Sequence, residues 1–107
     1  AAGDGGGVVR DLDAVVQVQE GAVVSKVVHR DERLDVTVFG FGAGEGLTEH
    51  RSTRVALLHV LRGRLRLTVD GVEHDAGPGF WLHMAEGAPH ALEAVEPTVL
   101  LLTQIRQ

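Results

Sequence analysis

The sequence contains no cysteine among its 107 residues, which excludes disulfide bonds, thiolate zinc sites and cysteine nucleophiles. It also has no apolar run close to the roughly 20 residues that a membrane-spanning helix needs. We therefore expect a soluble protein with no membrane partner. Without cysteine the composition does not fix the compartment, and a cytoplasmic location is the working expectation.

Positive charge is also scarce, because the formal net charge is -5 at pH 7. Binding to the phosphate backbone of a nucleic acid needs clustered positive charge. The one basic stripe, formed by Arg62, Arg64 and Arg66, alternates along a predicted strand, as a solvated sheet face does. We therefore expect no nucleic-acid partner.

A helical pattern with caps is missing as well, whereas short apolar and β-branched runs recur along the chain. Residues 34–38 and 64–69 alternate between apolar and polar side chains, which indicates strands with one buried face. Many short strands predict a small antiparallel sandwich or barrel, and so an all-β fold. Further strands are expected over residues 15–19, 22–30, 55–61, 80–84 and 98–105.

Glycine-containing turns separate these runs, and the sequence shows no long linker and no internal repeat. Asp70-Gly71 is the strongest turn signal, because both residues tolerate the positive φ angles of a tight hairpin. A second turn is expected at Arg62-Gly63. The glycine-rich start predicts a flexible tail over residues 1–7, which leaves a single domain over residues 8–107.

The spacing of residues from Gly44 onward resembles the first motif of the cupin family. Gly44 takes the place of its first glycine, His50 that of its first histidine, and Gly63 that of its closing glycine. Ser52 stands at the second histidine position and Ala56 at the glutamate position. The motif is therefore present in its glycines but incomplete in its metal ligands.

A second motif of the same family follows. Gly79 opens it, Gly87 takes its inner glycine and His90 its histidine, while Ala85 and Ala94 replace a proline and an asparagine. The chain thus resembles small single-domain cupins of the cupin 2 conserved barrel type, with degenerate metal-binding motifs. This resemblance implies a single-domain jelly-roll β-barrel that often carries one divalent transition metal.

The candidate metal ligands are His50, His90 and, more weakly, His59. Catalytic zinc sites usually have three protein ligands, and the two motifs supply only His50 and His90. Strand alternation turns His59 away from the barrel interior, towards which Ala56 would point, so His59 could be a ligand only if a β-bulge reversed the strand. The alternative for the His50–His90 pair is a polar pair that lines a pocket and bonds a ligand.

An apolar wall is expected around this pair, with Leu58, Val60, Met84 and Phe41 as the pocket-lining residues. Concave apolar sites with a few polar groups suit small molecules. The first hypothesis is therefore a protein that binds a small molecule, alone or together with a weakly held divalent metal. The alternative, implied by the resemblance, is a metal-dependent enzyme of the dioxygenase, isomerase or cyclase type, so catalysis stays an open question.

A surplus of apolar strand in so small a chain predicts a homodimer. Residues 22–28 and 98–105 are the clearest examples. Terminal strands with open edges favour pairing with a second copy of the chain.

Overall fold

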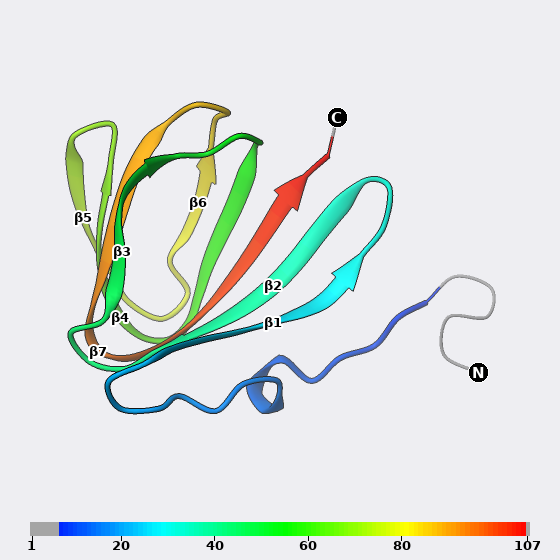
Figure 1. Cartoon of the computed structure of the whole chain (residues 1–107), viewed down its shortest axis with the longest axis horizontal. Coiled ribbons are helices and arrows are strands. Elements are labelled where there is room, and N and C mark those ends of the chain that lie inside the picture. Colours follow the sequence, from blue (N-terminus) through cyan, green and yellow to red (C-terminus); the bar gives the residue numbers. More distant parts are fainter. Residues whose placement is uncertain (1–6, 107) are drawn as a thin grey trace.

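The computed structural model describes residues 7–106, so all but Gly7 of the tail predicted for residues 1–7 lies outside the described residues. Within that range nearly all regular structure is β-strand, and no helix has the length and apolar character needed to cross a membrane. The strands are β1 (Val23–Arg30), β2 (Leu34–Phe41), β3 (Gly46–Arg51), β4 (Ala56–Val69), β5 (Val72–Ala76), β6 (Trp81–Met84) and β7 (Pro89–Ile105) (Figure 1).

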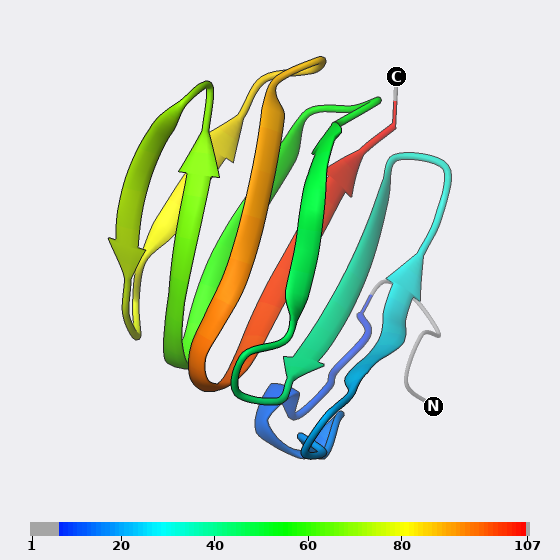
Figure 2. The ribbon, with the colours of Figure 1, turned by 60° about the vertical axis from the view of Figure 1, so that its left-hand side comes forward.

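The strands form two facing layers that share the long strands β4 and β7 (Figures 1 and 2). One layer contains β1, β2, the last part of β7, the first part of β4, and β6. The other contains β3, the first part of β7, the last part of β4, and β5. All pairings are antiparallel, and the sheet does not close on itself, so the all-β jelly-roll prediction is confirmed with open edges.

The hairpin between β4 and β5 forms where the sequence predicts it. Asp70 and Gly71 have φ angles of 50° and 79°, the two positive values that a type I′ turn requires. The turn predicted at Arg62-Gly63 is wrong, because β4 runs through it as one strand. Irregular register around Gly63 bends β4 from one layer into the other, and β7 bends beside it, so residues 98–105 are part of that longer strand.

Gly63 is required at this bend for two reasons. Its φ of 90° lies in the left-handed region that side chains with a Cβ disfavour. A Cβ at this position would also meet the carbonyl oxygen of Pro97 and the Cα of Thr98 on the neighbouring bend of β7. The two bent strands therefore pass each other at a distance that only glycine allows.

The strand predicted over residues 15–19 is also wrong. This segment follows a short 3-10 helix, η1 (Leu12–Ala14), and forms no strand. Its valines pack instead on the outer face of β2, where a Cβ on Gly40 would lie 3.3 Å from Val18 and 3.4 Å from Val16. Apolar, β-branched composition thus reflects burial against a sheet here, without hydrogen bonding to it.

The core lies between the two layers and is closed near the bends of β4 and β7. Phe41, Val60 and Leu65 are at most 1% exposed there. Thr98 is fully buried beside them, and its hydroxyl accepts the N–H of Arg64 at 2.9 Å. The same hydroxyl contacts two acceptors, the carbonyl oxygens of Glu96 at 2.7 Å and Arg64 at 3.1 Å. The opposite end lies beside the loops after β3 and β6 (Figure 1); because side chains leave a cavity there, we call it the open end.

Candidate functional site

A cavity of about 200 Å³ lies at this open end of the space between the layers. Its wall comes from the end of β3 and the loop after it, both ends of β7, the start of β4 and the end of β6. The residues that matter for the site are His50, Ser52, Ala56, Met84, His90 and Gln104.

His50 and His90 lie in contact at the edge of this cavity. They are direct cross-strand partners between β3 and β7, and their ring centroids are 4.0 Å apart at an interplanar angle of 61°. His90 is buried, at 6% exposure, whereas His50 is exposed at the cavity mouth. The two spacings that resemble cupin motifs therefore bring their histidines to one point.

Both imidazoles present the same ring nitrogen to the backbone. Nδ1 of His50 donates to the carbonyl oxygen of Thr48 at 2.9 Å, and Nδ1 of His90 donates to that of Ala88 at 3.0 Å. A carbonyl oxygen has no proton to give, so in each neutral ring the proton sits on Nδ1 and the lone pair on Nε2. A backbone carbonyl that fixes the tautomer in this way is typical of metal-binding histidines.

An apolar floor continues the cavity inward. A smaller hollow of about 50 Å³ adjoins the same two histidines. Its remaining wall is formed by hydrophobic side chains, including Phe39, Leu58, Met84, Leu92, Leu100 and Leu102. The site therefore combines a polar mouth with an apolar interior.

The predicted pocket residues divide into two groups. Leu58 and Met84 line the hollow, as expected for residues that face inward from β4 and β6. Phe41 and Val60 also face inward, but the structure places them in the closed core, away from the cavity wall. His59 lies on the opposite face of β4, beside Trp81 and Leu101, and contributes to neither cavity.

Gln104 is a polar side chain of the site that the sequence motifs do not indicate. It faces Ala56 across the β4–β7 pair, so the two residues share the inner face. The alternation of Leu100, Leu102 and Gln104 along β7 is the sequence signal for this orientation. The pairing with Ala56 is not visible in the sequence, because it depends on how distant strands align.

The carboxylate next to Gln104, that of Asp35, is hydrogen-bonded through both of its oxygens. Asp35 is the cross-strand partner of Gln104 on β2 and is 6% exposed. Its oxygens accept bonds from Arg106 at 2.8 and 3.0 Å, from Arg54 at 2.9 Å and from Arg30 at 3.1 Å. The bonds from Arg106 and then Arg54 hold the pKa of Asp35 below its ordinary value, against the opposing effect of burial.

The donor set limits how a metal could bind. Among residues 7–106, no three histidine, cysteine or acidic side chains converge on one point. The cavity wall has no carboxylate, and it includes Arg51, whose guanidinium donates to the carbonyl oxygen of Gly87 at 2.9 Å. The two imidazoles of this wall are fewer than the three protein ligands that are usual in catalytic zinc sites.

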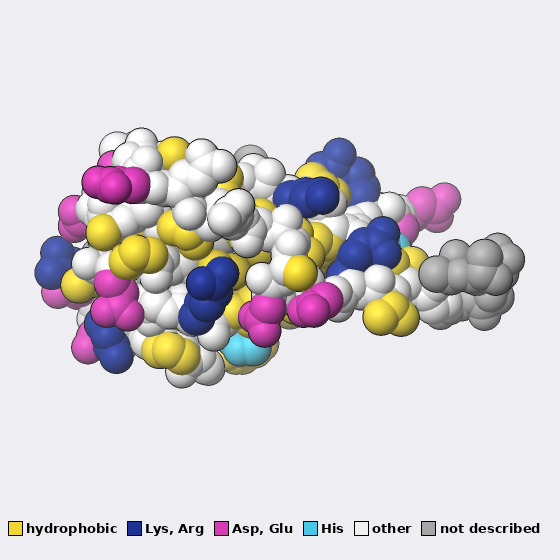
Figure 3. All heavy atoms as spheres, turned by 90° about the horizontal axis from the view of Figure 1, so that it is seen from below, with side chains coloured by type: hydrophobic (Ala, Val, Ile, Leu, Met, Phe, Trp, Pro, Cys, Tyr) yellow, Lys and Arg dark blue, Asp and Glu magenta, His cyan; other side chains and the backbone are white. Residues whose placement is uncertain are grey.

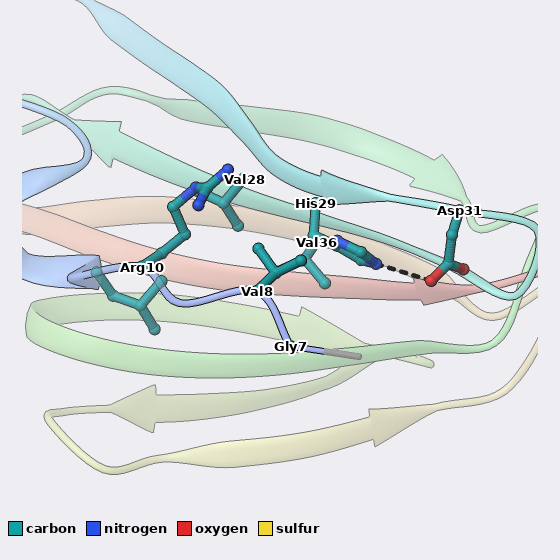
Figure 4. Close-up of a pocket in the computed structure, with 8 residues that line it drawn as sticks. Gly7, Val8, Arg10, Val28, His29, Asp31 and Val36 are labelled. Carbon is teal, nitrogen blue, oxygen red and sulfur yellow. Dashed lines mark hydrogen bonds and ion pairs between the residues drawn. The ribbon is translucent and has the colours of Figure 1, made fainter. Parts of the chain in front are cut away.

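A larger hollow of about 610 Å³ lies elsewhere, between residues 7–12 and the outer side of the β1–β2 hairpin (Figure 4). There, Nε2 of His29 contacts Oδ2 of Asp31 at 2.7 Å. That bond, with backbone N–H bonds from Arg33 and Leu34, lowers the pKa of Asp31 to about 2. The Asp31 carboxylate thus stabilises the turn between β1 and β2. The hollow itself is a shallow groove that is open to solvent.

Charge is distributed without a dominant sign over the surface drawn in Figure 3, where acidic and basic side chains are interspersed over the described residues. The arginine stripe of β4 is partly neutralised. Arg64 contacts Asp75 at 2.8 Å, and Arg66 contacts Glu93 at 3.3 Å. This arrangement matches a solvated sheet face.

Solved structures share this architecture along nearly the whole chain. A conserved Streptococcus pyogenes protein of unknown function is 29% identical, with a TM-score of 0.84 over 92% of this chain and 87% of that chain. An RmlC-like cupin from Desulfovibrio desulfuricans is 27% identical, with a TM-score of 0.80 over 91% and 94%. A cupin 2 conserved barrel domain protein from Leptotrichia buccalis is 32% identical, with a TM-score of 0.80 over 88% and 46%.

No curated protein matches the sequence. The family model described as "Cupin domain" matches residues 37–104, a range that includes both histidines, the bends of β4 and β7, and Gln104. The bent, two-layered sheet and the His50–His90 contact at its open end agree with that match. The chain therefore belongs to the cupin domain family.

Proposed function

We propose that the chain binds a small molecule in the cavity around His50 and His90. The observation that carries this proposal is the paired geometry of the two rings. Each Nδ1 is bonded to a backbone carbonyl, so both Nε2 lone pairs remain for a ligand at the boundary between a polar mouth and an apolar floor. A ligand with one polar end and a compact apolar body fits such a site.

The size and chemistry of the cavity narrow the class of ligand. Its volume of about 200 Å³ lies below the roughly 300–1,000 Å³ of pockets that hold drug-sized molecules. Because neutral Nε2 atoms accept hydrogen bonds, the polar end should carry a hydroxyl or N–H group. A weakly held divalent metal would satisfy the same lone pairs.

The second candidate is a metal-dependent enzyme of the isomerase, dioxygenase or cyclase type. The tautomer that the backbone imposes on both histidines favours it, since metal-binding histidines are oriented in this way. A bound metal would act as a Lewis acid on a carbonyl or hydroxyl oxygen. A putative mannose-6-phosphate isomerase from Ralstonia eutropha has a similar structure, but at 19% identity the likeness concerns the fold alone.

The test separates the two candidates. Chelator-treated protein without a histidine tag is screened by ligand-observed NMR against small hydroxylated compounds, and by calorimetry against zinc, manganese, iron(II), nickel and copper(II). The double variant His50→Ala/His90→Ala should lose binding. His83→Ala is the matched control, because His83 is an exposed histidine on β6 that lines neither cavity.

Binding of a small compound by the chelated protein, lost in the double variant, supports the binding protein. Binding that requires metal and is followed by turnover of the compound supports the enzyme. Retention of compound and metal binding in the double variant would refute both candidates.

We also propose that the chain forms a homodimer through the outer face of the layer that contains β6. Trp81 is 58% exposed there and lies in register with His59 on β4, which in turn pairs with Leu101 on β7. An exposed tryptophan in a stripe of half-buried side chains is typical of an interface.

Light scattering at micromolar concentration should give the mass of a dimer, and Trp81→Ser should lower this mass towards that of a monomer. Val72→Ser, at a similarly exposed valine on β5, should leave it unchanged.

A further inference from the structure

Gln104 lies across from the position at which the site lacks a metal-ligating side chain. In the cupin motif a glutamate would stand at Ala56, which is too short to reach the cavity centre with a polar group. Gln104 is the direct cross-strand partner of Ala56 and lines the same cavity. Cβ atoms of such partners lie about 4.5–5.5 Å apart, a gap that the long side chain of glutamine spans.

The amide of Gln104 is available to a ligand. In the hydrogen bonds of residues 7–106 its side chain has no partner, although the side chains around it are bonded. No side-chain nitrogen or oxygen in the described range is both buried and unsatisfied, so this amide reaches open space. The open space beside it is the cavity.

The neighbouring acidic residue does not compete for this role. Asp35 flanks Gln104 on the other side, but both of its oxygens accept bonds from arginine side chains. Freeing one of its oxygens would leave the buried carboxylate without an arginine bond. Gln104 therefore remains as an oxygen donor directly across from the glutamate position.

We propose that Oε1 of Gln104 completes the His50–His90 site as the third ligand of a divalent transition metal. This ligand comes from β7, whereas the glutamate of the cupin motif would come from the paired strand β4. This proposal rests on the proposed function in one respect, that His50 and His90 form the site. All three ligands are neutral, so the metal is held weakly and remains exchangeable. The small side chain of Ala56 provides the room into which Gln104 extends.

The experiment titrates zinc and nickel(II) into the chelator-treated chain and measures binding by calorimetry. Gln104→Leu removes the amide at nearly constant volume, and metal affinity should fall at least about tenfold, as for the loss of a supporting partner. Gln104→Glu supplies a carboxylate with two imidazoles, a set that transition metals favour, and affinity should rise at least about tenfold. Thr103→Val is the control, since Thr103 is next in sequence but faces outward.

The two variants at position 104 can each overturn the proposal. Affinity of Gln104→Leu equal to that of the wild type would overturn the proposal, as would failure of Gln104→Glu to improve binding. If the wild type binds too weakly to measure, stoichiometric binding by Gln104→Glu that disappears on adding His50→Ala supports it. Thermal melting of metal-free variants shows that they are folded. Failure of the proposed function would appear separately, as absence of any compound bound at the histidine pair.

Discussion

The two ends of the space between the layers differ in how completely it is filled. At the bends of β4 and β7, Phe41 and Leu65 have no exposed surface, and the Thr98 hydroxyl has all its bonds within the protein. At the open end, His50 and Gln104 offer polar atoms to a cavity. We therefore expect a division between the two ends, in which the closed end contributes most of the stability and the open end contributes the proposed binding.

Phe41 and Phe39 test this division most directly, because they stack on each other with centroids 5.8 Å apart. Phe41→Ala should lower the free energy of unfolding by about 3–5 kcal/mol, since it leaves a void in a closed core. Phe39 already borders a hollow and is only partly buried, so Phe39→Ala should cost clearly less. Urea denaturation measures both, and equal losses would contradict the division.

A second pair compares glycines with positive φ at the two ends. Gly63→Ala should destabilise by more than the roughly 1–3 kcal/mol of backbone strain, because the new Cβ also meets β7. Gly87, with a φ of 85° before β7, has nothing within 4 Å of a built Cβ. Gly87→Ala should therefore show the strain alone. Thermal melting measures which variant is less stable. A lower melting temperature for Gly87→Ala than for Gly63→Ala would contradict this prediction.

Acid should weaken the open end through Asp35. Its pKa in the folded chain is lowered, chiefly by Arg106, so its stabilising effect is present above the unfolded carboxyl pKa of about 3.9 and is lost as pH falls through the lower folded value. Asp35→Asn should flatten the decline of stability below about pH 4. Asp31→Asn removes the other lowered carboxyl, whose pKa is about 2, and should flatten the decline of stability between about pH 4 and about pH 2. An unchanged acid profile in Asp35→Asn would show that its arginine bonds do not stabilise the fold.

The smallest effect on stability is expected at the mouth itself. His50 is exposed, and its ring bonds only the nearby Thr48 carbonyl, so His50→Ala should change the free energy of unfolding by no more than about 0.5 kcal/mol. The same substitution should abolish binding in the titrations described above. A loss of several kcal/mol in urea denaturation would mean that the histidine pair is structural.

Local patterns predict the parts of the fold that depend on neighbouring residues. Alternation correctly indicates β2 and the second half of β4, and Asp70-Gly71 indicates the hairpin. The turn predicted at Gly63 is wrong because a glycine in a turn and a glycine at a close crossing leave the same local signal. The strand predicted over residues 15–19 is wrong because burial on a sheet and pairing within it favour the same side chains.

The site divides in the same way. Motif spacing anticipates that His50 and His90 occupy one region, and the structure brings their rings to 4.0 Å. It could not indicate Gln104, since the partner of Ala56 is set by the alignment of β4 with β7. Phe41 and Val60 share a face with the cavity residues, but their depth along the barrel is fixed by the bend, which no local pattern reveals.

The shared strand β7 also has a consequence for the order of synthesis. It follows the other six described strands in the sequence, yet it pairs with β2, β3 and β4. On a ribosome that adds about 5–20 residues each second, the hairpins β1–β2 and β4–β5 emerge first and have no common partner until β7 follows. Both layers, the core and the cavity can therefore assemble only after β7 has been synthesised.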